Sequence, residues 1–414
     1  MAAAPVSPSG ATRTPLADAR FRDLWLSSGL FFSGFWAQTV VLAWLAFELT
    51  DSEFAVAAFT AARFAPLLIG PLGGLLADRT HRPRTLRRSI AIALALGIAV
   101  AALASFGDIA YWQIVIGGLL IGMMQAPLQP VRFTLIMDIV GREQISTANA
   151  LNMAAMFGSR IVAPAIAGWV ISAAGADVAL WFSAAWYIPA WLLLARFEEI
   201  GRTSPISQAR IIPDLLEGFR IIVRHRAMAG VLMASVAANV FAWPVMQGFL
   251  PVFAEQVLDV GASGLGVLVA ANGLGALVGA LTIASMGNVR RKGRLFFVAT
   301  AIFGLMLSAF ALTDRMPLAL VLIFLAGFAS AGFGVMQSTL LLLLAPEEVR
   351  GRAMGVLMLS IGVLPVSLLV LGAIAAVVGV IATTIVAGVV LALVMVTLAV
   401  TVPEVWRIGD ERVP

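Results

Sequence analysis

The longest uncharged segment of the chain covers Ala353–Pro403, a run of 51 residues. A single helix of that length would extend roughly 76 Å, which is more than twice the thickness of a bilayer. The run therefore contains two helices, and Gly379 is the predicted turn between them. The chain is 61% hydrophobic and only 12% charged, so the solvent around most of it must be lipid.

Ten further apolar runs are each long enough to cross a bilayer. They are Leu24–Phe47, Phe54–Ala77, Ser89–Gly107, Ile109–Val131, Gln144–Ala176, Val178–Ala195, Ala227–Ala254, Val260–Val289, Leu295–Thr313 and Met316–Pro346. Only Arg63 and Arg160 interrupt them. The runs lack the two-residue alternation of barrel strands. The predicted fold class is therefore an all-α membrane protein with twelve transmembrane helices.

The basic residues alternate from one connection between spans to the next. Nearly all of the 27 Lys and Arg residues precede the first span, follow the last, or follow an even-numbered span. The other connections carry Asp51, Glu53, Asp108, Asp177, Asp259, Asp314 and, as their one basic residue, Arg315. Positively charged connections stay in the cytoplasm. Both termini are therefore expected in the cytoplasm, and the protein in a bacterial inner membrane.

The second half of the chain repeats landmarks of the first. Gly158 and Gly168 recur 204 residues later as Gly362 and Gly372. Such duplication is typical of transporters whose two bundles rock around a midplane site. The predicted parts are a cytoplasmic tail (1–21), a six-helix bundle (22–196), a connector (197–226), a second six-helix bundle (227–402) and a tail (403–414), with pseudo-twofold symmetry between the bundles. Residues 213–226 of the connector form a predicted amphipathic helix on the inner leaflet.

Several classes of protein are poorly supported by the composition. The chain has no cysteine, and its two histidines, His81 and His225, fall in predicted connections. No metal site, cofactor or enzyme activity is therefore expected. No phosphate-binding glycine loop occurs, so ATP is not the direct driver. Nucleic-acid binding would need a basic stripe on a soluble face, which the sequence lacks.

The connection after the second span reads Gly73-Gly74-Leu75-Leu76-Ala77-Asp78-Arg79-Thr80-His81-Arg82-Pro83-Arg84. It resembles the signature of the major facilitator superfamily, Gly-x-x-x-Asp-Arg-x-Gly-Arg-Arg, with His81 and Pro83 as departures. The resemblance is closest to the branch of enterobactin exporters and macrolide-efflux-like proteins. That branch shares Pro66, Asn149-Ala150-Leu151, Arg160-Ile161-Val162-Ala163-Pro164-Ala165, Glu217-Gly218-Phe219-Arg220 and Pro346-Glu347-Glu348-Val349-Arg350-Gly351-Arg352. Ala163 stands where the exporter motif has glycine.

The resemblance implies a conformational latch at the cytoplasmic ends of the second and fourth spans. Its members would be Gly74, Asp78, Arg79, Arg82 and Asp138. An acid at a helix end can pair with arginine and face another helix's positive N-terminus. Such a latch would hold the outward-facing state closed at the cytoplasm. The alternative is that these arginines only fix the topology.

Long polar side chains inside spans should face a cavity or a partner. The predicted substrate-cavity residues are Gln38, Arg63, Gln125, Gln129, Arg132, Asn152, Arg160, Asn239, Trp243, Gln247, Asn272 and Gln337. Asn149 lies on the same helix face as Asn152, and Phe35, Trp36 and Phe249 are candidate aromatic walls. For the asparagines, hydrogen bonding between helices is an equal alternative. Arg160 is open to a structural interpretation.

An excess of arginine over carboxylate inside the spans favours an anionic or polar substrate. Glu48 and Glu255 are the nearest candidates for proton coupling. The function implied is alternating-access export of a small amphipathic or anionic compound, siderophore-like or drug-like, driven by the proton-motive force. The alternatives are an organic-anion importer and a non-transporting receptor. The expected partners are the substrate, the bilayer and H⁺, and the protein is expected to be a monomer.

Overall fold

The computed structural model describes residues 15–69, 81–107, 109–125, 128–195, 211–286, 289–346 and 349–408. Within these ranges the chain forms helices and no strand. Ten helices are long and apolar enough to cross a membrane, and Tyr111–Gln125 forms a shorter apolar helix. The predicted all-α membrane fold is confirmed. The count of twelve spans stays a prediction, because the segment after Ile69 lies outside the described residues.

The first half of the chain, here the N-half, follows a short 3₁₀ segment, η1 (Pro15–Ala17). Its helices are α1 (Ala19–Thr50), α2 (Glu53–Phe64), the 3₁₀ segment η2 (Ala65–Ile69), α4 (Arg82–Ser105), α5 (Tyr111–Gln125), α6 (Leu128–Ala174), α7 (Ala176–Ala185) and α8 (Tyr187–Ala195). Gly141 adopts φ 70° inside α6, so α6 breaks there into two spans.

The second half, here the C-half, begins at Arg226. Its elements are α10 (Arg226–Phe241), the π-helical η3 (Val245–Phe249), α11 (Leu250–Val252), the π-helical η4 (Phe253–Val257), α12 (Gly261–Ser285), α13 (Lys292–Ala311), α14 (Met316–Leu344), α15 (Arg350–Gly362), α16 (Leu364–Val378), α17 (Val380–Thr401) and α18 (Pro403–Trp406). The predicted turn at Gly379 is confirmed: this residue has φ 85° and separates α16 from α17.

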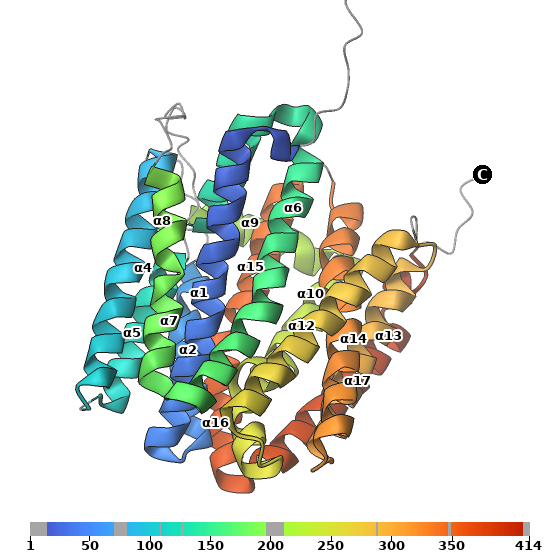
Figure 1. Ribbon diagram of the computed structural model, residues 1–414. Helices are drawn as coiled ribbons and strands as arrows, with labels where there is room; N and C mark the ends of the chain where they lie inside the picture. The colour runs from blue at the N-terminus through green and yellow to red at the C-terminus, as the bar shows by residue number, and fades with distance from the viewer. Residues whose placement is uncertain are drawn as a thin grey trace, which may run out of the picture.

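The two halves lie side by side with their helices near a common axis, N-half on the left and C-half on the right of Figure 1. One end of the bundle, here the basic end, carries Arg84, Arg87, Arg88, Arg291 and Lys292 at the starts of α4 and α13. The opposite end, here the acidic end, carries Asp51, Glu53, Asp177, Asp259 and Asp314. The alternation of charge along the sequence therefore becomes two ends of opposite charge.

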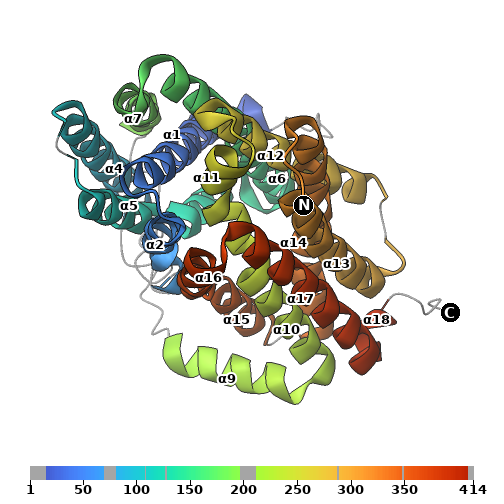
Figure 2. The same ribbon diagram turned by 90° about the horizontal axis from the view of Figure 1, so that it is seen from below.

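The connector contains helix α9 (Ile211–Arg224), close to the predicted 213–226. It lies across the edge of the C-half (Figure 2), where Glu217 forms an ion pair of 3.0 Å with Arg352 of α15. Ile222 is buried, whereas Phe219 and Val223 are exposed. The contact joins two of the motifs that carry the resemblance, Glu217 in the connector and Arg352 near the start of α15.

Candidate substrate site between the two halves

Arg160 of α6 reaches from the N-half to the C-half near the middle of the bundle. Its guanidinium carbon lies 4.8 Å from the ring centroid of Trp36 and 5.7 Å from that of Trp243. Its Nη2 donates a hydrogen bond of 3.2 Å to Oε1 of Gln247. The cation is thus held between an aromatic residue of each half and tied to an amide across the interface.

Each half of the chain supplies one tryptophan to this site. Trp36 in α1 and Trp243 after α10 are 207 residues apart, close to the offset of the repeated glycines. Arg160 has no basic counterpart in the second half, because the residue 204 positions later is Leu364. The site therefore has an aromatic wall from each half and a single positive charge, which only the N-half supplies.

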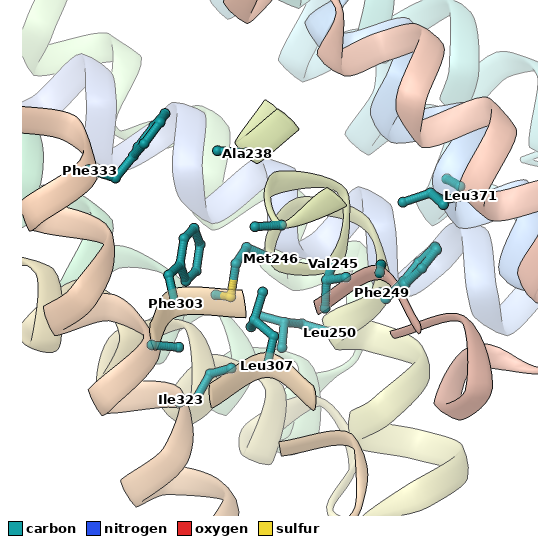
Figure 3. Close-up of a cluster of buried hydrophobic side chains, with 14 of the residues drawn as sticks. Ala238, Val245, Met246, Phe249, Leu250, Phe303, Leu307, Ile323, Phe333 and Leu371 are labelled. Carbon is teal, nitrogen blue, oxygen red and sulfur yellow. The ribbon is translucent and has the colours of Figure 1, made fainter. Parts of the chain in front are cut away.

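Gln247 owes its position to irregular helix geometry. It lies in the π-helical segment η3, which Pro251 follows within two turns. Proline cannot donate to the carbonyl four residues earlier, which here is that of Gln247, and its ring crowds that carbonyl. Insertions of π geometry relieve such conflicts and are frequent at functional sites. The neighbours Val245, Met246 and Phe249 are buried in the C-half core (Figure 3), which anchors the segment from behind.

A small cavity lies beside Arg160 between the halves. Its volume is about 30 Å³, and it is lined by Trp36, Thr39, Val40, Ala43, Arg160, Met246, Gln247, Leu250, Pro251, Leu265 and Val269. This is room for roughly one or two waters. The site is therefore nearly closed in this conformation, and a substrate would need the halves to separate.

The polar groups of this cavity are incompletely satisfied. Among the described residues, no carboxylate lies within ion-pair distance of Arg160. The indole Nε1 of Trp36 is buried, and it too has no hydrogen-bond partner among the described residues. A half-buried cation without a counter-ion and a buried donor without an acceptor both carry a cost in free energy. Both would be satisfied by an anionic group that accepts hydrogen bonds.

The halves close against each other at the acidic end. A Cβ on Gly168 of α6 would lie 2.3 Å from the carbonyl oxygen of Ala262, and one on Gly372 of α16 would lie 2.4 Å from Cβ of Ala57. Ser263 also donates its backbone N–H to Oγ of Ser172, at 3.1 Å. Only glycine permits such close contacts. The two glycines that repeat in the sequence thus form equivalent seals on either side of the bundle.

Toward the basic end, the face of α1 that carries Trp36 borders a groove. Gly29 and Ser33 precede Trp36 and Val40 at helical spacing, so the four residues share one face of α1. The groove has a volume of about 300 Å³ and is lined by Trp25, Leu26, Gly29, Leu30, Ser33, Ala155, Gly158, Ser159 and Val162. The structure is therefore closed at the acidic end, while the α1–α6 wall beyond Arg160 is hollow toward the basic end.

Four other predicted cavity residues lie inside the N-half in this conformation. Arg63 is 1% exposed, and its Nε and Nη2 bond to Thr39 Oγ1 at 2.7 Å and to the carbonyl of Phe35 at 3.0 Å. Gln38 accepts a hydrogen bond from Tyr187. Arg132 donates to Ser28, which in turn donates to Asn152. These side chains tie helices together and do not line the cavity beside Arg160 in this conformation, and their place in a substrate cavity stays a prediction.

In the C-half, Asn239 bonds to its own helix at Ser235, and Asn272 donates to the carbonyl of Ile323. Gln337 is half-buried, and its Oε1 has no partner among the described residues. Gln125 is half-buried at the end of α5, and the side chains of Gln129 and Asn149 lie outside the described residues. Glu48 and Glu255 are exposed at the acidic end, away from the lining of the cavity.

Two residues of the proposed latch form an ion pair, and their role as a latch stays a proposal. Arg82, at the start of α4, makes an ion pair with Asp138 near the end of the first span of α6. Arg82 is buried, and the side chain of Asp138 is one-third exposed. Gly74, Asp78 and Arg79 lie outside the described residues, so their contribution to the latch stays a proposal.

Replacing Asp138 with asparagine is expected to lower the free energy of unfolding by about 1–3 kcal/mol, because the ion pair between Asp138 and buried Arg82 is lost. Thermal unfolding of the purified protein measures the effect. The reversed pair, Arg82→Asp with Asp138→Arg, should recover part of the loss. Equal stability of Asp138→Asn and the unmodified protein would show that the ion pair contributes nothing.

The bundle and the charged site between its halves define a multi-pass membrane transporter. Residues 10–410 match the transmembrane secretion effector family. The chain belongs to this family, a branch of the major facilitator superfamily, and is not an enzyme. The family consists of membrane transporters and includes exporters, in agreement with the resemblance seen in the sequence.

Curated relatives and solved structures agree with this assignment. The enterobactin exporter EntS of Shigella flexneri is 27% identical over 218 residues, which are 53% of this chain and 51% of that protein. EntS of Escherichia coli O1:K1 is 27% identical over 221 residues, with the same coverage. The match thus spans about half the length of these relatives.

Among solved structures, a POT family transporter in complex with 5-aminolevulinic acid has a TM-score of 0.79 at 10% identity, covering 93% of this chain and 96% of that one. The nucleoside transporter NupG has a TM-score of 0.73 at 16% identity, covering 94% and 100%. A bacterial homologue of the lysosomal transporter Spinster, inward-facing and unoccupied, has a TM-score of 0.67 at 14% identity, covering 94% and 96%. At these identities the likeness shows the fold.

Proposed function

We propose that this protein exports a small organic anion with an apolar or aromatic part, by alternating access around Arg160. The observation that carries the proposal is the Arg160 guanidinium, held between Trp36 and Trp243 with no carboxylate in ion-pair distance among the described residues. A substrate carboxylate, phenolate or catecholate would supply the missing negative charge, while the two indole rings would pack against its apolar part.

The proposed transport cycle has the site exposed alternately at the two ends of the bundle. In this structure the acidic end is sealed by Gly168 and Gly372, so a substrate would enter from the basic end. We place the basic end and both termini in the cytoplasm, because that end carries most of the Lys and Arg residues. Separation of the glycine seals would then release the anion on the outer side.

The proton-motive force is the proposed driver, in a protein that acts as a monomer. When an anion leaves a cell whose interior is negative, its electrostatic free energy falls by about 2.3 kcal/mol per charge for each 100 mV of membrane potential. The electrical part of the proton-motive force can therefore drive export, and coupling to H⁺ through Glu48 or Glu255 would add the chemical part. The enterobactin exporters among the relatives favour export over the alternative, import of an organic anion.

The test is the retention of two probes, a catecholate siderophore and a cationic dye, by cells with and without the protein. Each is measured with and without a protonophore. The proposal predicts loss of the siderophore alone from cells that make the protein, abolished by the protonophore. Loss of the dye alone would contradict the anion proposal, and greater accumulation of the siderophore would establish import.

A further inference from the structure

A second polar hollow lies on the outer helices of the N-half, at the basic end. Here it is called the arginine pocket, and its lining is Arg84, Arg87, Arg88, Ala91 and Trp191, around a volume of about 360 Å³. The four α4 residues follow i, i+3, i+4, i+7 spacing, so they share one face of that helix. Trp191 comes from α8, which packs antiparallel to α4 (Figure 1).

The pocket brings three guanidinium groups together beside one aromatic ring. The guanidinium carbon of Arg87 lies 6.0 Å from the Trp191 ring centroid, which limits how far that side chain can move. Arg84 and Arg88 are exposed beside it, and the small side chain of Ala91 leaves the space between them open. Guanidinium groups pair with phosphate oxygens bidentately. The first turns of α4 add the positive end of its dipole.

The surface next to the pocket is apolar and faces lipid. Ile92, one turn beyond Arg88, is 46% exposed, and Ile188 and Leu192 on α8 are 46% and 50% exposed. These residues continue from the pocket toward the middle of the membrane on the same two helices. A ligand with a phosphate head and long apolar chains fits this surface, whereas free phosphate would contact only the arginines.

We propose that the arginine pocket binds the headgroup of an anionic phospholipid, whose acyl chains lie along α4 and α8. Basic pockets between transmembrane helices at the positively charged side of a membrane protein commonly hold such headgroups. The site is separate from the Arg160 site. The bound lipid would fix the start of α4, where Arg82 meets Asp138, to the surrounding leaflet.

Native mass spectrometry of the full-length protein in detergent tests this proposal. Cardiolipin, phosphatidylglycerol and phosphatidylcholine are the probes, and retention of each lipid is measured. The variant Arg84→Gln/Arg87→Gln/Arg88→Gln should retain cardiolipin about 100-fold more weakly, because three basic contacts are lost. A control variant, Arg20→Gln/Arg22→Gln/Arg407→Gln, removes three exposed charges from the same end and should retain it unchanged.

Three results would overturn the proposal. They are equal retention by the pocket variant, equal loss in the control variant, and displacement of the lipid by millimolar inorganic phosphate, which would indicate a site for free anions. Where the glutamine variant does not fold, the charge-preserving Arg84→Lys/Arg87→Lys/Arg88→Lys variant replaces it. Lysine lacks the bidentate geometry, so about tenfold weaker retention supports the proposal and unchanged retention contradicts it.

Discussion

Replacing Arg160 with glutamine is expected to weaken the binding of an anionic catecholate to the purified protein by at least about 30-fold. Losing a charged hydrogen-bonding partner in a buried site costs about 2 kcal/mol or more. Glutamine removes the charge but keeps part of the length of the side chain. It therefore disturbs the contacts with Trp36 and Trp243 less than alanine would. Calorimetric titration measures the affinity, and a cationic dye should bind no worse to the variant.

Arg63→Gln is the matched control for this prediction. Arg63 also lies beside an aromatic ring, 4.3 Å from the Phe35 centroid, but it is fully buried and ties α2 to α1 inside the N-half. The loss of Arg63 should lower the melting temperature and leave the anion affinity of the folded protein within about threefold, since Arg63 does not line the cavity and its hydrogen bonds go to Thr39 and Phe35 of the N-half. Equal losses of affinity in the two variants would mean that Arg160 has no special role.

Replacing Gly168 with valine is expected to force the acidic end open. The first side-chain carbon alone would lie 2.3 Å from the Ala262 carbonyl oxygen, which is backbone and cannot rotate away. Overpacking of this kind costs about 1–3 kcal/mol, enough to shift a two-state equilibrium by about five- to 150-fold. Gly372→Val should act in the same way at the equivalent seal.

The chain contains no cysteine, so spin labels attach only at cysteines introduced at chosen positions, and the distance between two labels reports this change directly. Labels at Val178 and Val377, both exposed at the acidic end, should move apart in Gly168→Val, while labels at Arg22 and Met286 at the basic end approach each other. Gly334→Val is the control, since a Cβ there meets no atom within 4 Å. Unchanged distances in Gly168→Val would show that this glycine contact does not hold the acidic end closed.

Much of the fold could be predicted because lipid imposes strong constraints on a sequence. Long uncharged runs must be helices, and the 51-residue run needed the turn that Gly379 forms with a positive φ. The charge alternation predicted the two ends of the bundle. The repeated glycines predicted duplication, but not their role. Only the packing of the helices shows that Gly168 and Gly372 contact the opposite half.

The sequence predicted several residues of the site but not how they are arranged in space. Arg160, Trp243 and Gln247 were among the expected cavity residues, and they do meet. Arg132 and Gln38 are also polar residues inside spans, but they form hydrogen bonds within the N-half, and sequence spacing does not distinguish these outcomes. The π geometry that positions Gln247 arises from a proline whose effect depends on the surrounding packing.

The arginine pocket illustrates a different limit. Its arginines were predicted to fix the topology, which is the usual role of basic residues at the end of a span. Trp191 is 103 residues from Arg88 in the sequence, so only the packing of α8 on α4 reveals a shared pocket.

The central claim, export of an anion through the Arg160 site, is tested most directly by flux into inside-out membrane vesicles. In these vesicles export appears as accumulation, and a lumen-positive potential should draw an anion inward. We predict that energised vesicles containing the protein accumulate the catecholate, that collapse of the potential stops this, and that vesicles with Arg160→Gln do not accumulate it. Equal accumulation by the Arg160→Gln vesicles, or accumulation of the cationic dye alone, would contradict the claim.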